Sequence, residues 1–517
     1  MDPARVLAVA VADVRTRLRR PGTGVLVLVS AFVAWLAIPD PATGAGLLKI
    51  GGARALYTSP ALAFATAAFF AFPLSLFGFY LVSNALERDV RAHVATVVAA
   101  SPVGNAEYLL GKLVGNLALL AVVTLGFLAA AMAMQVVRGE GPLEPATYLA
   151  HYALLLVPCI AWVAAIALLF ECAPGLSGRV GDVVYFFAWT TTLMLGVEPW
   201  RKADVPASWL GRCLDYTGLG YLIREVGRLV GTSEFTIGYA PVDATTAPLL
   251  FPGLQFTAEA VTSRATALLA PMVLFLCAVV LFRRFDPART RARGGGGRRS
   301  LPALLAAVAR PLGRPLLFVL DRLAPDAALS FRVRPPLVLL AVTFGALGLA
   351  LPTQAVREAL LPGVFVVLSV ALADVATRER QAGLAGIVAA TPGRRRGFAQ
   401  WKLGSSALVA LLLAGVPVVR LLAAQPTAGV SALVGVLFLA AAAVALGIAT
   451  ATPKTFMALS LALWYLALNA KGHTPALDYG GWWASAPPRV QAGWAAATIL
   501  AAGLALVAQR SRLARED

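Results

Sequence analysis

Charged residues are scarce in this chain of 517 amino acids. Asp, Glu, Lys and Arg together make up 14% of it, while 59% of the residues are hydrophobic. Soluble globular domains contain about 25% charged residues. The composition therefore excludes an ordinary soluble protein, and a mean hydropathy of +0.77 indicates that the chain belongs in a lipid bilayer.

Residue patterns typical of several catalytic sites are also missing. The three histidines, His93, His151 and His473, are far apart, and no His-Glu-x-x-His motif occurs. There is no Gly-x-x-x-x-Gly-Lys-Ser/Thr phosphate loop and no Gly-x-Ser-x-Gly elbow. We therefore predict no catalytic residue and no metal or cofactor bound by this chain, and we expect that it cannot hydrolyse ATP alone.

Cysteine gives no sign of a disulfide framework. Only four occur, without paired spacing, and only one of them falls in a predicted outer loop. We expect all four to be structural: Cys159, Cys172, Cys213 and Cys277.

Long apolar runs are abundant. A membrane-spanning helix needs roughly 20 mostly apolar residues to cross a hydrocarbon core about 30 Å thick. The runs lack the two-residue alternation of barrel strands, and helices satisfy their own backbone inside lipid. We predict an all-α polytopic membrane protein with twelve transmembrane helices, at 23–39, 60–85, 108–136, 147–171, 182–198, 263–282, 336–352, 359–376, 403–423, 429–450, 455–470 and 491–508.

The net charge of +18 gathers at the ends of these runs. Arginines cluster from Arg15 to Arg20, from Arg283 to Arg299, after Pro392 and in the tail. If the chain starts in the cytoplasm, twelve spans place every cluster on the cytoplasmic side, as the positive-inside rule requires. We expect a multi-pass protein of the cytoplasmic membrane with both termini inside, and a basic face against anionic lipid instead of nucleic acid.

The N-terminus reads as a helix lying in the inner interface. Leu7, Val11, Val14 and Leu18 share one helical stripe, with arginines on the other faces. The charges follow the short apolar stretch instead of preceding it, which is not the order of a signal peptide.

The middle of the chain predicts a division into two halves. Residues 284–335 contain four consecutive glycines and many arginines, typical of a flexible cytoplasmic linker. The stretch "LPALLAAVARPLGRPLLFVLDRL" within it predicts a second interfacial helix. We therefore expect a first six-span half over 1–283 and a second over 336–517.

One segment occurs twice. "DVRAHVATVVAASPVGNAEYLLGKL" begins at Asp89, and "ERQAGLAGIVAATPGRRRGFAQWKL" begins at Glu379. Without a gap, an acid, a hydroxyl–proline pair and a lysine keep the same spacing. Proline disfavours helix at the residue before it, so Ser101-Pro102 and Thr391-Pro392 are expected to end a short helix. An ordinary interfacial loop is the alternative, although such a loop has little reason to keep its register.

A second, shorter echo follows the fifth span of each predicted half. "LDYTG" begins at Leu214 and "LDYGG" begins at Leu477. Its position in the corresponding outer loop favours an internal repeat, an arrangement common in transporters.

The repeated segment resembles a segment of the type 2 ABC exporter permeases. That family has an acid, a small-residue apolar helix, a threonine– or serine–proline and a lysine at the start of the third span. The second copy matches this pattern including Gly383, whereas His93 stands in place of that glycine in the first. The span order and the outer loop after the fifth span extend the resemblance over most of the chain.

The resemblance implies that each segment is a coupling helix, which docks into a separate ATPase carrying ATP and magnesium. With both halves on one chain, residues 88–102 and 378–392 would contact two ATPase copies. The lysines at the start of the third spans would be Lys112 and Lys402. The ATPase-contact residues would be Arg88, Asp89, Arg91, Ser101, Pro102, Arg378, Glu379, Arg380, Thr391 and Pro392.

Few polar residues at membrane depth are candidates for a transport path or gate. Asp374 aligns with Asn84 near the inner ends of their spans, and an ion pair between Asp374 and Arg378 is the structural alternative. In the outer loops, the resemblance implies re-entrant helices and a gate formed by Asp215, Tyr216, Asp478 and Tyr479. A belt of interfacial aromatics is the alternative there.

The exporter permease is the first of three hypotheses. An ion-coupled secondary transporter would also have twelve spans and two repeats, but it needs acids or cation sites within the spans. A membrane enzyme acting on a lipid-linked substrate would need clustered acids or histidines at one face.

Overall fold

The computed structural model divides the chain into two compact units, residues 1–295 and 296–517. It describes residues 2–19, 21–41, 44–176, 178–197, 208–231, 235–242, 246–282, 285, 311, 313–321 and 324–516. Most of the predicted linker, most of the predicted second interfacial helix and residues 199–207 of the outer loop lie outside these ranges. Each unit is described by itself below.

Unit 1 is built mainly from long apolar helices. Proline stands in the first turn of several of them, where its fixed φ favours helix and no amide donor is lost. The helices are α1 (Pro3–Leu18), α2 (Pro21–Ala37), α3 (Ser59–Val82), α6 (Asn105–Arg138), α7 (Pro145–Cys172), α8 (Arg179–Val197), α11 (Ala258–Ala267) and α12 (Leu269–Leu281).

Unit 2 repeats this construction. The short α15 meets α16 at a bend of 100°. Its elements are α15 (Pro325–Val333), α16 (Pro336–Ala350), α17 (Thr353–Ala355), the π-helix η4 (Val356–Leu360), α18 (Leu361–Leu372), α21 (Pro392–Ala424), α22 (Pro426–Thr450), α23 (Pro453–Ala470), the 3₁₀-helix η5 (Pro475–Leu477) and α24 (Pro488–Glu516).

The helices agree with a multi-pass membrane protein. Within the described ranges, nine helices are long and apolar enough to span a bilayer, or up to eleven if α1–α2 and α15–α16 each count as one bent span. Each of the twelve predicted ranges coincides with a helix or a pair of consecutive helices, but α23 does not pass this test. The total of twelve spans therefore stays a prediction.

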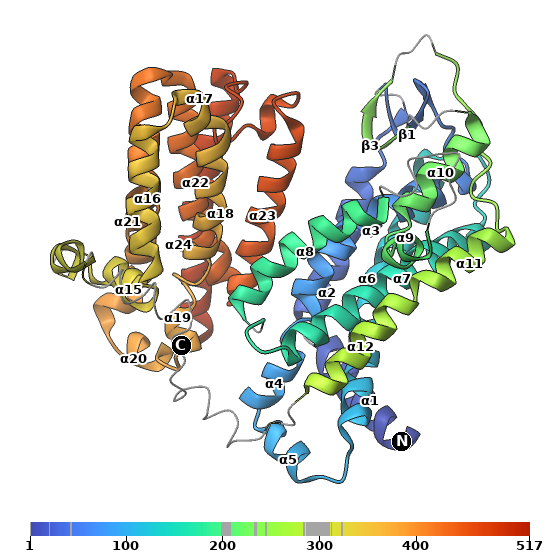
Figure 1. The fold of residues 1–517 in the computed structure, drawn as a ribbon, viewed down its shortest axis with the longest axis horizontal. Helices are drawn as coiled ribbons and strands as arrows, with labels where there is room; N and C mark the ends of the chain where they lie inside the picture. The colour runs from blue at the N-terminus through green and yellow to red at the C-terminus, as the bar shows by residue number, and fades with distance from the viewer. Residues whose placement is uncertain are drawn as a thin grey trace. The chain divides into compact units, whose positions relative to one another are not determined.

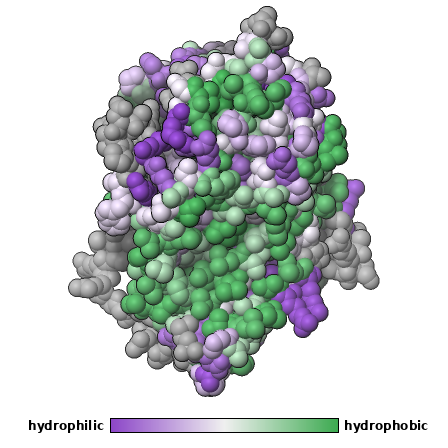
Figure 2. Space-filling model, turned by 90° about the vertical axis from the view of Figure 1, so that its right-hand side faces the viewer, coloured by the Kyte–Doolittle hydropathy of each residue, from purple (hydrophilic) through white to green (hydrophobic). Residues whose placement is uncertain are grey.

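The surface of unit 1 carries the apolar side chains that lipid requires. Figure 2 shows a broad hydrophobic area on one face, with hydrophilic residues gathered above it. Along α12, large apolar side chains are more than one-third exposed: Leu269, Met272, Val273, Leu276 and Val280. An apolar surface of this kind is expected where lipid replaces water.

A small sheet at one end of unit 1 was not predicted from the sequence. The strands β1 (Ala45–Ile50), β2 (Ala53–Arg54) and β3 (Phe235–Pro241) form an antiparallel sheet in the order β2-β1-β3. Arg54 pairs with Glu140 at 2.6 Å, and its hydrogen bonds hold the pKa of Glu140 below its usual value. The helices α9 (Trp209–Leu214) and α10 (Leu219–Val230) lie at the same end (Figure 1).

The first repeated segment lies at the opposite end of unit 1 from the sheet (Figure 1). It consists of two short helices, α4 (Ala85–Arg91) and α5 (Val94–Ala100). The second repeated segment also forms two short helices at one end of unit 2, α19 (Arg378–Gln381) and α20 (Ala385–Ala389). From here on, the first and second repeated segments denote residues 88–102 and 378–392.

Candidate functional site

The two repeated segments follow the same backbone path. In each, a left-handed residue separates the two short helices: His93 has φ of 58° and Gly383 has φ of 73°. Both helix pairs end before the hydroxyl–proline pair, as predicted, because Ser101 and Thr391 have extended backbones. Pro392 is then the first residue of α21. His93, the one departure from the family pattern, therefore occupies a position that favours glycine.

We predict opposite effects for exchanging these two residues. His93→Gly should raise the stability of the full chain by about 1 kcal/mol, because a non-glycine residue in this region is strained. Gly383→Ala should lower it by about 1–2 kcal/mol. An added Cβ at Gly383 meets open space, so only backbone strain contributes. Thermal unfolding of both variants in detergent tests this, and equal shifts of the same sign would contradict it.

A buried lysine anchors the first repeated segment. Lys112 on α6 is 4% exposed, and its Nζ lies 2.8 Å from Asp89 on α4 and 3.0 Å from Asp13 on α1. The Tyr108 hydroxyl donates to the Asp89 carboxylate at 2.5 Å. Arg17 lies 2.6 Å from the other oxygen of Asp13. We call these five residues the first lysine cluster.

The second repeated segment is anchored in the same manner. Lys402 on α21 is fully buried and pairs with Glu379 on α19 and, at 2.9 Å, with Asp326 on α15. Ser405 donates to Asp326 at 2.6 Å, and Arg378 lies 3.9 Å from the same carboxylate. The Lys402 ammonium also lies 4.3 Å from the centre of the Trp401 ring. Lys402, Glu379, Asp326, Ser405 and Arg378 form the second lysine cluster.

The lysine and the two acids of the first cluster have counterparts at equivalent places in the second. Asp89, Lys112 and Gly115 align without a gap with Glu379, Lys402 and Ser405. A Cβ added at Gly115 would lie 2.4 Å from Asp13, which is where Ser405 hydrogen-bonds Asp326. The acids of α1 and α15, which the sequence analysis missed, therefore take equivalent places. Each lies shortly before the first apolar run of its half, which is a sequence signal that could have identified it.

The outward side of each segment is apolar. On α5, Val94 is 43% and Val97 is 67% exposed. In the second segment, Leu384 is 46% and Ile387 is 68% exposed. Asp89 and Glu379 face the lysines instead, with only 16% and 14% of their side chains exposed. Among the predicted ATPase contacts whose side chains the structure describes, the exposed residues are Pro102, Arg380 and Thr391.

The structure also places other residues of the first repeated segment. Arg88 is half-buried, Arg91 ends α4, and Arg5 donates to the carbonyl of Pro102 at 2.9 Å. Glu171, at the end of α7, accepts the first two amides of α4, from Ala85 and Leu86, at 2.8 and 2.7 Å. A carboxylate at a helix N-terminus is stabilising, so Glu171 favours the start of α4 at Ala85.

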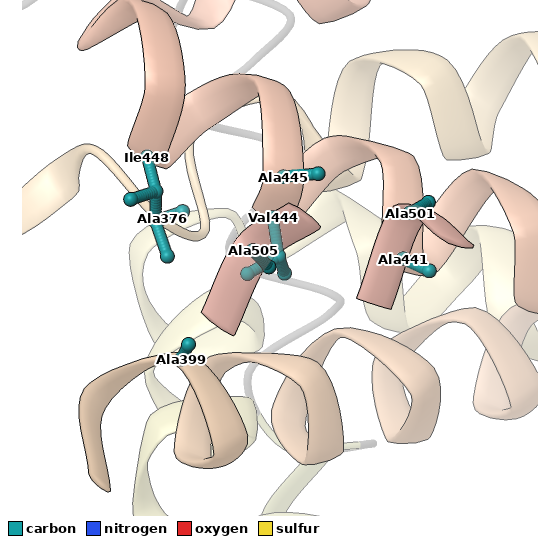
Figure 3. Close-up of a cluster of buried hydrophobic side chains, with 8 residues drawn as sticks. All are labelled: Ala376, Ala399, Ala441, Val444, Ala445, Ile448, Ala501 and Ala505. Atoms are coloured by element: carbon teal, nitrogen blue, oxygen red, sulfur yellow. The ribbon is translucent and has the colours of Figure 1, made fainter. Parts of the chain in front are cut away.

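A buried apolar cluster, shown in Figure 3, includes residues that are close in sequence to the second lysine cluster. Ala376 precedes α19, and Ala399 lies one turn before Lys402 on α21. They belong to a buried cluster of small side chains: Ala376, Ala399, Ala441, Val444, Ala445, Ile448, Ala501 and Ala505. Leu86, Tyr108, Leu109 and Phe282 form a corresponding cluster in unit 1. In unit 2, the alanines of this cluster allow the helices to approach closely beneath the second segment.

The two candidate path residues lie beside the segments. Asn84 precedes α4 in a left-handed conformation. Asp374 pairs with Arg334 at 2.5 Å and, as the structural alternative predicted, with Arg378 at 3.6 Å. Arg334 also donates to the carbonyls of Val370 and Ala371. These contacts indicate that Asp374 connects the ends of α18 and α15, and its role in a transport path stays a prediction.

The predicted gate residues form one local motif in both units. Asp215 and Asp478 end short helices with φ, ψ of −79°, 54° and −80°, 52°. Each carboxylate accepts two downstream amides, from Gly220 and Tyr221 in unit 1 and from Trp483 and Ser485 in unit 2. A left-handed glycine follows three residues later, Gly218 or Gly481.

The motif is buried in both units, and within the described ranges an ion pair is found in that of unit 1 alone. Arg264 lies 2.9 Å from Asp215, and burial raises the pKa of Asp215 against the opposing effect of this guanidinium. Tyr216 stacks on Trp162 at 4.5 Å, and Tyr479 packs against Phe365 and Trp482. The motif therefore folds the outer loop, and its role as a gate stays a prediction.

Comparisons with family models, curated proteins and solved structures identify no relative. No match is found in any of the three. In the part of the chain that the structure describes, no three His, Cys, Asp or Glu residues are placed to hold a metal ion. The two repeated segments and their lysine clusters are therefore the features from which we infer a function.

Proposed function

We propose that this chain is the membrane permease of an ATP-driven exporter and that a separate ATPase docks on residues 88–102 and 378–392. ATP and magnesium belong to that ATPase. The permease carries substrate across the cytoplasmic membrane, with the repeated segments and both termini on the cytoplasmic side.

One observation carries the proposal: each unit presents a short apolar helix outward on a support of buried charges. Val97 and Ile387 are about two-thirds exposed, on helices that end before a proline. A plain loop needs no buried ion pair, because burying charges is costly. A small apolar helix held in a fixed place is suited to a groove in another protein.

The duplicated geometry supports two docking sites on one chain. The left-handed residues His93 and Gly383, the two lysines and the two outer aspartate motifs recur at matching positions. We therefore propose two homologous six-span halves, each engaging one ATPase copy or domain.

The proposal is tested by recovering the tagged full chain from its native membrane after cross-linking. We expect an ATPase with a phosphate-loop motif to be recovered, and its amount to fall at least tenfold in the double variant Val97→Asp, Ile387→Asp, because a buried charge opposes docking in an apolar groove by more than about 1.4 kcal/mol. Leu250→Asp is the matched control, because Leu250 is 66% exposed at the sheet end of unit 1. Equal recovery from all three proteins would refute docking at these helices.

A further inference from the structure

We infer that Lys112 and Lys402 are positioning residues that fasten each repeated segment to the following span and to the helix before the first span of its unit, α1 or α15. Below, α1 and α15 are termed the interfacial helices, although the sequence predicted the second one within 301–323. In the proposed function, on which this use of the link rests, docking would then move three elements together. The lysines link these elements to one another, which is a role separate from that of the exposed apolar helices that would dock.

The geometry that points to this role is a single ammonium shared by two carboxylates from different elements. Lys402 extends from α21 and contacts Asp326 of α15 and Glu379 of α19. Lys112 extends from α6 and contacts Asp13 of α1 and Asp89 of α4. The partner acids are 76 and 99 residues from their lysines in the interfacial helices, and 23 residues away in the segments. Lysine has three donors on a compact charge, so one ammonium can hold both acids.

The second cation in each cluster shows what the lysine adds. Arg17 compensates Asp13 at 2.6 Å, and Arg378 lies 3.9 Å from Asp326, which Ser405 also hydrogen-bonds. The interfacial acid thus has a neighbouring positive charge without the lysine. In unit 1, the lysine then connects that acid to the acid of the repeated segment. In unit 2, Arg378 belongs to the segment itself and also donates to Ser330 of α15 at 3.0 Å, so Lys402 adds a second connection. If the lysine only balanced local charge, it would not need to contact carboxylates of two different elements.

A displaced segment would consequently pull on the interfacial helix. In unit 2, α15 continues into α16 through a bend of 100°, so the same movement would reach the first span of that unit. The lysine also stands on α21, which carries the movement directly into the bilayer. Both routes, through α15 and through α21, depend on the Lys402 side chain.

The experiment measures the distance between α15 and α20 in the full chain without any ATPase. Spin labels replace Leu329 and Ile387, which are 40% and 68% exposed, in a chain whose Cys172 and Cys277 are changed to alanine. The double variant Lys402→Met, Glu379→Gln removes one charge of each sign and leaves Asp326 with Arg378. We expect one narrow distance distribution in the parent and a broadened, shifted one in this variant.

Two matched controls separate linkage from general loss of structure. Glu379→Asp restores the residue type of the first half and should keep the parent distribution. Arg420→Met removes a cation from the far end of α21, where Arg420 donates to the carbonyl of Leu349, and should also leave it unchanged. An unchanged distribution in the double variant would overturn the inference.

Unit 1 provides a second variant if the first fails to fold. Lys112→Met, Asp89→Asn likewise leaves Asp13 paired with Arg17, and labels at Val11 and Val97, 52% and 67% exposed, report the distance. Broadening there supports the link, and an unchanged distribution refutes it. If no ATPase is recovered from the parent membrane, the proposed function fails, while these distances still decide the inference.

Discussion

Methionine in place of Lys402 is expected to destabilise the full chain by about 3–5 kcal/mol, the usual effect of removing one partner from a buried ion pair. Lys402 is 0% exposed, and the side chains of its partners Asp326 and Glu379 are 2% and 14% exposed. The methionine side chain is unbranched and one heavy atom shorter than that of lysine, so most of the packing is preserved. The loss comes mainly from Glu379, which remains largely away from water without its ammonium, because Asp326 keeps Arg378 at 3.9 Å.

Unfolding in detergent, followed by heat or denaturant, measures this effect. Lys402→Met, Glu379→Gln is the informative comparison, because it also removes one of the stranded negative charges and should recover much of the stability. Lys112→Met should cost less than Lys402→Met, since Asp89 is 16% exposed and Asp13 is 8% exposed. A Lys402→Met chain as stable as the parent would show that the cluster does not hold the segment.

The helices of this fold could be predicted from the sequence because each arises from a local apolar run. All twelve predicted ranges coincide with helices, since burial in lipid and intrahelical hydrogen bonds act within one segment. The sheet could not be predicted in this way. β1 pairs with β3 far along the chain, Ile50 opposite Phe235, and the residues of β1, AGLLKI, do not alternate between apolar and polar.

The candidate site, too, could be predicted from the sequence only in part. The acid, the proline and the lysine were visible because two copies keep their spacing, and Ser101 and Thr391 do end the short helices. The reason for that spacing was not visible, because it depends on tertiary contact between the acid and the lysine. Asp13 and Asp326 were missed because each meets its lysine only after the chain has crossed and returned.

Alanine in place of Asp215 is the second change for which we expect a large effect, again about 3–5 kcal/mol. The substitution strands Arg264, whose side chain is 4% exposed, and removes the acceptor of the Gly220 and Tyr221 amides that begin α10. The carbonyl of residue 215 still accepts from Arg264, so part of the contact survives. Unfolding in detergent gives the magnitude.

Asp478→Ala is the natural comparison, because Asp478 occupies the same backbone motif and forms no ion pair among the residues that the structure describes. Its carboxylate accepts from the amides of Trp483 and Ser485 and from the Ser485 hydroxyl. Losing the hydrogen bonds of a buried group costs about 1–3 kcal/mol, and Asp478→Ala strands no buried cation in the described structure, so the Asp215 variant should be the less stable. Adding Arg264→Met to Asp215→Ala should narrow the difference, since the stranded charge is then gone. If the two single variants lose equal stability and Arg264→Met restores none, the buried charge contributes nothing beyond the shared backbone motif.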